Sequence, residues 1–188
     1  MAHIAGQYYH IYNRGVEKRN IFRSNENYRF LLRHIKEFLP SYHITFIAYC
    51  LMPNHYHFLI RAEENDCIAP FIQRLFNSYT QAFNRQENRS GTLFEGRAKS
   101  KLIGENGYLF HIARYIHLNP VSAGLCRMPE DWVYSNYREF IGLRHGTLYD
   151  PAFIRTQFET PQEYRRFVEN AATDQIERAL KKYMNGDI

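Results

Sequence analysis

The segment YHITFIAYCLMPNHYHFLIRA, residues 42–62, contains two β-rich stretches on either side of the turn residues Pro53 and Asn54. The first stretch, residues 42–52, is almost continuously apolar, which is typical of a central strand buried on both faces. The second, residues 55–62, follows the turn directly, so we expect the two strands to form a hairpin. The rest of the fold is predicted outward from this hairpin.

The elements on either side of the hairpin are predicted from turn residues that end strands, capping residues that begin helices, and apolar residues at helical spacing. These signals predict strands at residues 6–15 and 92–103, helices at 24–40 and 67–88, and a third helix from about residue 105 to Leu118, stopped by Pro120. The order β-α-β-β-α-β-α predicts an α+β fold, a ferredoxin-like antiparallel sheet with two helices on one face.

The remainder of the chain is less regular. Residues 129–140 predict an extended or mixed segment, and residues 160–184 predict one or two amphipathic helices. We therefore expect a main domain of residues 1–140, followed by a C-terminal helical extension of residues 141–188.

The composition argues against several classes of protein. No run of about 18 apolar residues is present, so we expect no membrane span, and the first residues lack the basic and apolar regions of a secretion signal. Three cysteines with no CxxC spacing argue against a disulfide framework or a zinc knuckle and favour a reducing, cytoplasmic setting.

The positive charge is unevenly distributed. Residues 1–127 carry 16 Lys and Arg against 9 Asp and Glu, whereas residues 128–188 carry 8 against 10. The positive excess in residues 1–127 suits a nucleic-acid partner, although many enzymes carry a similar charge.

The hairpin carries two histidines, His55 and His57, at alternate positions of its second strand. Strand geometry places both on one face, about 7 Å apart, with Tyr56 and Phe58 on the other. Two imidazoles on one face can reach a single cation. Histidines that only pack in a core or lie at a surface would give the same pattern, so a metal site needs a third ligand from elsewhere.

The third predicted helix offers such a ligand. Its apolar stripe consists of Leu109, Ile112, Ala113 and Ile116, and a different face carries Tyr108, His111, Tyr115 and Asn119. Tyr115 and Asn119 are one helical turn apart, so an amide ligand could lie beside a nucleophilic phenol. Alternatively, Tyr115 is an aromatic at the edge of the core and Asn119 only ends the helix.

A predicted strand rich in basic residues is a third candidate for a functional role. Arg97, Lys99 and Lys101 alternate along one predicted face at about 7 Å spacing, close to the phosphate repeat of a single strand. Arg85 and Arg89 lie just upstream, near aromatic residues that could stack on bases. A strand face that is only exposed to solvent, with no bound partner, would show the same alternation of basic residues.

Three ordered motifs carry a family resemblance: YCLMPNHYHFLI at 49–60, SYTQAFNRQENRSGTLFEGRAKS at 78–100 and YLFHIARYIHLNPVSAGL at 108–125. Together they resemble the single-tyrosine HUH transposases, in particular the REP-associated tyrosine transposases. The resemblance extends from about Gln7 to Phe140, within the predicted main domain.

The resemblance implies roles for particular residues. His55 and His57 would bind Mg²⁺ or Mn²⁺, with Asn119 as the third ligand, and Tyr115 would attack the DNA. The DNA itself would be contacted by a basic set comprising Arg14, Arg85, Arg89, Arg97, Lys99 and Lys101.

The resemblance also implies an activity. Such an enzyme cleaves and joins single-stranded DNA at hairpins, here REP-like palindromes, through a 5′-phosphotyrosine intermediate in DNA transposition. The expected location is cytoplasmic and nucleoid-associated, and the protein would act as a monomer or a homodimer. Two other readings stay open: a domesticated protein that binds repeated hairpins without cleaving them, and a metal-dependent phosphodiesterase that uses water.

Overall fold

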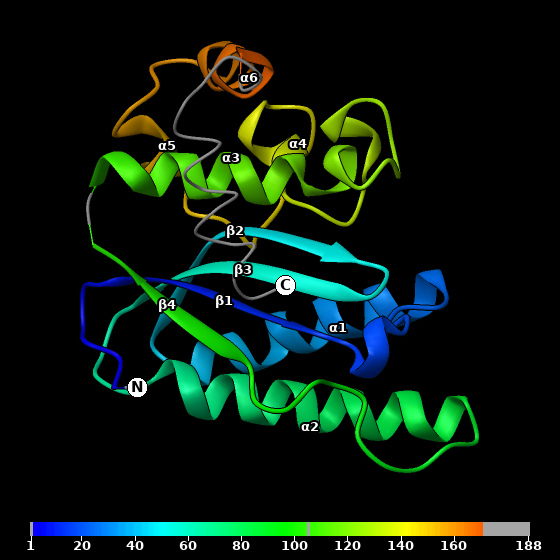
Figure 1. The fold of residues 1–188 in the computed structure, drawn as a ribbon. Coiled ribbons are helices and arrows are strands. Elements are labelled where there is room, and N and C mark those ends of the chain that lie inside the picture. Colours follow the sequence, from blue (N-terminus) through cyan, green and yellow to red (C-terminus); the bar gives the residue numbers. More distant parts are fainter. Residues whose placement is uncertain (1, 105, 171–188) are drawn as a thin grey trace.

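A computed structural model describes residues 2–104 and 106–170. A four-stranded antiparallel sheet forms the centre of the molecule, in the order β2-β3-β1-β4 (Figure 1). Its strands are β1 (Tyr8–Arg14), β2 (Ile44–Met52), β3 (His55–Ala62) and β4 (Lys99–Ile103). With the intervening helices, this order is the predicted ferredoxin-like arrangement. None of the described helices is long and apolar enough to cross a membrane.

Two helices, α1 (Asn25–Phe38) and α2 (Ile68–Gln86), cover one face of the sheet (Figure 1). The amphipathic α1 is capped by Ser24, whose side chain accepts a hydrogen bond from the backbone N–H of Asn27 and completes a capping box. Buried aromatic and aliphatic side chains of both helices meet those of the sheet in a first core. Tyr56 and Phe58 belong to this core, as strand alternation predicts.

The opposite face of the sheet is covered by α3 (Asn106–Ser122), which packs mainly against β2 (Figure 1). A second core forms there from Leu109, Ile112, Ala113 and Ile116 together with side chains of β2 and β3. The predicted apolar stripe of this helix is thereby confirmed. Short helices α4 (Tyr137–Phe140), α5 (Pro151–Arg155) and α6 (Pro161–Glu169) contribute further side chains to the same core.

The prediction that residues 42–52 form a central strand is wrong in one respect, because β2 lies at the edge of the sheet. It is apolar on both faces because the two cores cover it on either side. Its outer edge is occupied by residues 132–136: the backbone N–H of Leu51 donates to the carbonyl of Tyr134, and the Trp132 indole donates to the carbonyl of Leu51. A covered edge offers no template for another strand.

Two element boundaries also differ from the predictions. Helix α3 contains Pro120 and continues to Ser122, because a proline near a helix end removes only one backbone hydrogen bond. Strand β4 begins at Lys99, so Arg97 lies outside it. Helix α6 confirms the beginning of the predicted C-terminal helices; residue 105 and residues 171–188 lie outside the described residues. The division of the chain at residue 140 stays a prediction.

Candidate metal and nucleophile site

The two histidines of the hairpin lie on the face of β3 that is turned toward α3. His57 is fully buried, and its Nε2 atom has no hydrogen-bond partner among the described residues. The Nδ1 atom of His55 lies 2.6 Å from Oδ1 of Asn54 in the preceding turn. The turn therefore orients one imidazole, and the unpartnered Nε2 of the other is free to bind a ligand.

A third histidine, His10 on β1, contacts this pair. Its Nε2 atom lies 3.0 Å from Nδ1 of His57, and the two rings stack with centroids 5.1 Å apart. If Nδ1 of His57 carries the proton and donates to His10, then Nε2 of His57 keeps its lone pair. This is the tautomer that a metal ion requires.

The amide of Asn119 reaches the site from α3. Its Oδ1 atom lies 3.0 Å from Nε2 of His55. Two imidazole nitrogens and an amide oxygen are therefore presented by side chains from β3 and α3. Among the residues that the structure describes, no group of three or more His, Cys, Asp or Glu side chains is placed so that it could hold a metal ion.

Tyr115, one turn before Asn119 on α3, points to the same place. Its ring centroid lies 5.6 Å from that of His57 and 6.4 Å from that of His10. Burial raises the pKa of the Tyr115 phenol, and a hydrogen bond with Asn119 lowers it and partly opposes this effect. The structure therefore brings Tyr115, Asn119 and both histidines of the hairpin together within one chain.

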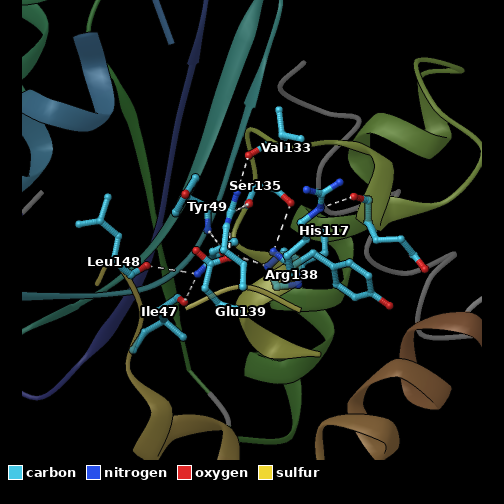
Figure 2. Close-up of polar contacts among 12 residues, drawn as sticks. Ile47, Tyr49, His117, Val133, Ser135, Arg138, Glu139 and Leu148 are labelled. Carbon is cyan, nitrogen blue, oxygen red and sulfur yellow. Dashed lines mark hydrogen bonds and ion pairs between the residues drawn. The ribbon is translucent and has the colours of Figure 1, made fainter. Parts of the chain in front are cut away.

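A buried polar network holds α3 on the edge strand (Figure 2). The His117 imidazole lies 3.0 Å from Oδ1 of Asn136 through Nε2 and 2.8 Å from the Tyr164 hydroxyl through Nδ1. The Asn136 side chain also accepts from the backbone N–H of Tyr49 and donates to the carbonyl of Ile47. Because His117 lies between Tyr115 and Asn119 in the sequence, this network fixes where both of them point.

The imidazoles of the site are kept neutral by their surroundings. Burial lowers the pKa of His55, and it lowers that of His57 well below the ordinary value, with the neighbouring histidines adding to the effect. Burial and the nearby Lys101 lower the pKa of His10 to about 3. Neutral imidazole is the form that ligates a cation, so the donor set fits a divalent metal ion.

Basic side chains surround the site on two sides. A cavity of about 20 Å³ beside the two histidines, large enough for one water or small ion, is lined by Arg14 and Lys99 among others. Arg14 is paired with Glu95 at 2.6 Å. Lys101 belongs to the same face of β4 as Lys99, because they are two residues apart and pair with His10 and Tyr12 of β1. These three predicted DNA contacts therefore lie around the candidate site.

The other predicted DNA contacts lie elsewhere. Arg97 precedes β4 and lines a different cavity, beside α2, so the predicted row of three cations on one strand face is wrong. A glycine at position 96 with a positive φ of 68° interrupts the extended chain there. Arg85 and Arg89 lie at the end of α2, where Arg89 donates to the Asn84 side chain and to the carbonyl of Thr92.

The sequence reasoning missed His10, His117 and Asn136. The alternation of YYHIYNR on β1 places His10 on the same face as Tyr8 and Tyr12. Its contact with His57 depends on the register of β1 against β3, in which Tyr12 pairs with His57 and His10 with Leu59. No local sequence signal gives that register.

Comparisons with known proteins bear on this geometry. A family model described as "Transposase IS200 like" matches residues 3–119. A protein of Haemophilus influenzae, provisionally named a REP-associated tyrosine transposase, is 30% identical over 125 residues, which are 57% of this chain and 71% of that protein. A solved structure of a REP-associated tyrosine transposase bound to a REP hairpin has a TM-score of 0.61 at 18% identity, covering 79% of this chain and 90% of that one.

Proposed function

The chain belongs to the IS200-like transposase family, and on that premise we propose that it cleaves and rejoins single-stranded DNA at hairpins, with Tyr115 as the nucleophile. A structural relative bound to a REP hairpin supports hairpin DNA as the substrate class. The observation that carries the proposal is the meeting of Tyr115 with His55, His57 and Asn119 at one point. A protein that only binds DNA has no physical need for that combination.

His55, His57 and Asn119 would hold a divalent cation, Mg²⁺ or Mn²⁺, through two imidazole nitrogens and one amide oxygen. When bound, the cation supplies polarisation of the scissile phosphate and stabilises the charge that develops in the transition state. Burial lowers the pKa of His55 and His57 and so keeps both imidazoles in the neutral form that can bind a cation. His10 would orient His57 by accepting a hydrogen bond from Nδ1–H, with the two nitrogens 3.0 Å apart.

Tyr115 carries out the covalent step. Its phenolic oxygen attacks the phosphorus and gives up its proton, a bond forms from Tyr115 to the 5′-phosphate, and the bond to the 3′ oxygen breaks. The leaving 3′ oxygen takes up a proton and becomes a free 3′-OH, so no net proton is consumed. The phosphotyrosine conserves the bond energy, so a second strand's 3′-OH can displace Tyr115 and join new DNA without a nucleotide cofactor.

Basic side chains beside the histidines would attract the phosphates of the DNA strand. Arg14 and Lys99 line the cavity beside the histidines, and Lys101 follows Lys99 on the same strand face. Cations in this arrangement bind successive phosphates and give a salt-dependent affinity. The elevated pKa of the buried Tyr115 keeps the phenol protonated at rest.

One chain supplies every residue of this site, so we propose that Tyr115 acts in cis and that a monomer is sufficient for cleavage. The catalytic domain is proposed to include residues 1–140, with 141–188 as the extension whose α6 packs against α3. Because the proposed substrate is DNA, we also propose that the protein lies in the cytoplasm with the nucleoid.

The test is a covalent adduct. The protein is incubated with a labelled hairpin oligonucleotide and Mn²⁺, denatured, and separated by size. We expect wild type to form a denaturation-resistant protein–DNA adduct and Tyr115→Phe to form none. Tyr108→Phe, a matched change on the same helix, should form the adduct normally.

Two other outcomes would replace the proposal. Binding of the hairpin without cleavage in any divalent metal would favour a domesticated DNA-binding protein. A free 5′-phosphate with no adduct at any time would favour hydrolysis by water.

A further inference from the structure

The Pro53–Asn54 turn that precedes the two histidines is held in place by the segment that follows β1. The backbone N–H groups of Ile21 and Phe22 donate to the carbonyl of Pro53, at 2.8 and 2.9 Å. The N–H of Gly15 donates to the carbonyl of Asn54 at 2.8 Å. The segment therefore fixes the position from which the Asn54 side chain reaches the site.

The backbone of this segment is tightly constrained. A Cβ atom at Gly15 would collide with the backbone carbonyl oxygen of Arg19, so only glycine fits there without a shift of the turn. Lys18, in the same turn, has a positive φ of 57°, which is costly for a residue that carries a side chain. Strain of this kind persists where the surrounding structure holds it, and it is concentrated at functional sites.

The carbonyl of Lys18 decides how the Asn54 amide is oriented. It accepts a hydrogen bond from Nδ2 of Asn54 at 3.3 Å. A carbonyl only accepts, so the amide nitrogen must face it and the amide oxygen must point the other way. That oxygen, Oδ1, lies 2.6 Å from Nδ1 of His55. Because an amide oxygen also only accepts, Nδ1 of His55 has to carry the proton in this short contact.

The other nitrogen of the same imidazole also faces an acceptor. Nε2 of His55 lies 3.0 Å from Oδ1 of Asn119. Burial raises the pKa of the Tyr115 phenol, and a hydrogen bond with Asn119 lowers it. A hydrogen bond that favours the phenolate is donated to it, so Nδ2 of Asn119 faces Tyr115 and Oδ1 is left to face His55.

A neutral imidazole has one N–H and cannot satisfy acceptors on both sides. When Asn54 takes that proton, Nε2 of His55 and Oδ1 of Asn119 are two acceptors with no hydrogen between them. A cation bound at about 2.1 Å to each of two ligand atoms at a right angle sets those atoms about 3.0 Å apart. The observed separation of 3.0 Å therefore fits two neighbouring ligands of one ion.

We propose that Asn54 is a positioning residue of the cation site, which fixes His55 as the tautomer with its proton on Nδ1 and so keeps Nε2 free to bind the ion beside Asn119. Asn54 acts through His55 and is not itself a ligand. Without Asn54, the remaining acceptor is Oδ1 of Asn119, which draws the proton to Nε2 and blocks the position of the ion. The inference rests on the proposed function in taking a divalent cation as the ligand.

The first measurement uses the metal-free protein in EDTA. The ¹⁵N chemical shifts of histidine-labelled protein identify the tautomer of each imidazole, and the His55 signals are assigned by their loss in His55→Gln. We expect the wild-type ring to carry its proton on Nδ1, and the ring in Asn54→Ala to carry it on Nε2. Asn54→Asp retains an acceptor at Oδ1 and should keep the wild-type tautomer.

The second measurement is the affinity for Mn²⁺, followed by electron paramagnetic resonance. We expect Asn54→Ala to bind Mn²⁺ about 10- to 100-fold more weakly than wild type, as loss of a supporting partner does elsewhere. Asn54→Asp should bind as tightly as wild type. Asn65→Ala, which removes an exposed amide after β3, is the matched control and should change neither the tautomer of His55 nor the affinity.

The outcomes separate this inference from the proposed cleavage. A proton on Nε2 of His55 in wild type would overturn the inference, as would Asn54→Ala with the wild-type tautomer or the wild-type affinity. A loss of affinity with no movement of the proton would show that Asn54 only supports the turn. If both measurements shift as expected while wild type forms no adduct with Mn²⁺, the role of Asn54 stands and the proposed cleavage fails.

Discussion

The Nε2 atom of His55 lies 3.0 Å from Oδ1 of Asn119, so a strand residue and a helix residue 64 positions apart in the sequence meet at one point. The contact places an amide oxygen beside the histidine pair and sets Tyr115, one helical turn away, against His57. The helix that carries Tyr115 and the strand that carries His55 and His57 are thus held in a fixed relation within one chain.

Asn119→Leu should remove the amide ligand while nearly preserving side-chain volume. Because one of the three proposed protein ligands is lost, we expect Mn²⁺ affinity to fall by at least the roughly 10- to 100-fold that loss of a supporting partner costs. Electron paramagnetic resonance titration of free Mn²⁺ measures this directly. Asn119→Asp retains an oxygen ligand and should bind Mn²⁺ well; unchanged affinity in Asn119→Leu would remove Asn119 from the ligand set.

His10→Phe should weaken metal binding without touching a ligand. The change removes the imidazole nitrogen that lies 3.0 Å from Nδ1 of His57 and that, in the proposed arrangement, accepts the Nδ1 proton. The His57 ring is then free to adopt the other tautomer. We expect Mn²⁺ affinity to fall about 10- to 100-fold. His34→Phe, a change of the same type on α1, is the control. Equal affinities in the two variants would show that His10 has only a packing role.

The buried His117 makes the free energy of unfolding depend on pH. Burial lowers its pKa to about 4 from the ordinary value near 6.5, so below pH 6.5 the unfolded chain binds a proton that the folded chain does not. Its contribution to stability is therefore present above pH 6.5 and is lost as the pH falls toward 4, by about 1.4 kcal/mol per pH unit. Urea unfolding of wild type and His117→Gln between pH 7 and pH 5 measures the difference, and parallel pH dependences would contradict it.

Asn136→Leu should destabilise the fold strongly. The Asn136 amide satisfies the His117 imidazole, the N–H of Tyr49 and the carbonyl of Ile47, and all three would be left buried without this partner. We expect a loss of about 3 kcal/mol or more in the free energy of unfolding. Gln81→Ala, which removes an exposed amide, should change stability by less than about 0.5 kcal/mol. Similar unfolding midpoints for both variants would show that the network is not stabilising.

Much of the site follows from the sequence because it depends on local periodicity. Strand alternation alone places His55 and His57 on one face, and helical periodicity alone places Tyr115 beside Asn119. The order of elements likewise gives the ferredoxin-like sheet. That β3 and α3 face one another is not a local property, and the sequence suggested it only through the resemblance of its three motifs to a family.

The errors come from long-range contacts that no local pattern shows. The apolar run of β2 predicts burial on both faces correctly, yet it cannot tell a central strand from an edge strand that residues 132–136 cover. The alternation around Arg97 predicts a strand, but the chain turns at Gly96 before β4 begins. Pro120 predicts a helix end, and α3 runs two residues beyond it.

The most direct test of the central claim is the identity of the covalent bond. A hairpin oligonucleotide labelled differently on each side of its cleavage site is reacted with the protein and Mn²⁺, and the adduct is digested and mapped by mass spectrometry. The account predicts that the adduct carries only the 3′-side fragment, joined through its 5′-phosphate to Tyr115, and that the 5′-side fragment ends in a free 3′-OH. A phosphate joined to any other residue, or cleavage by the wild-type protein with no covalent adduct, would contradict it.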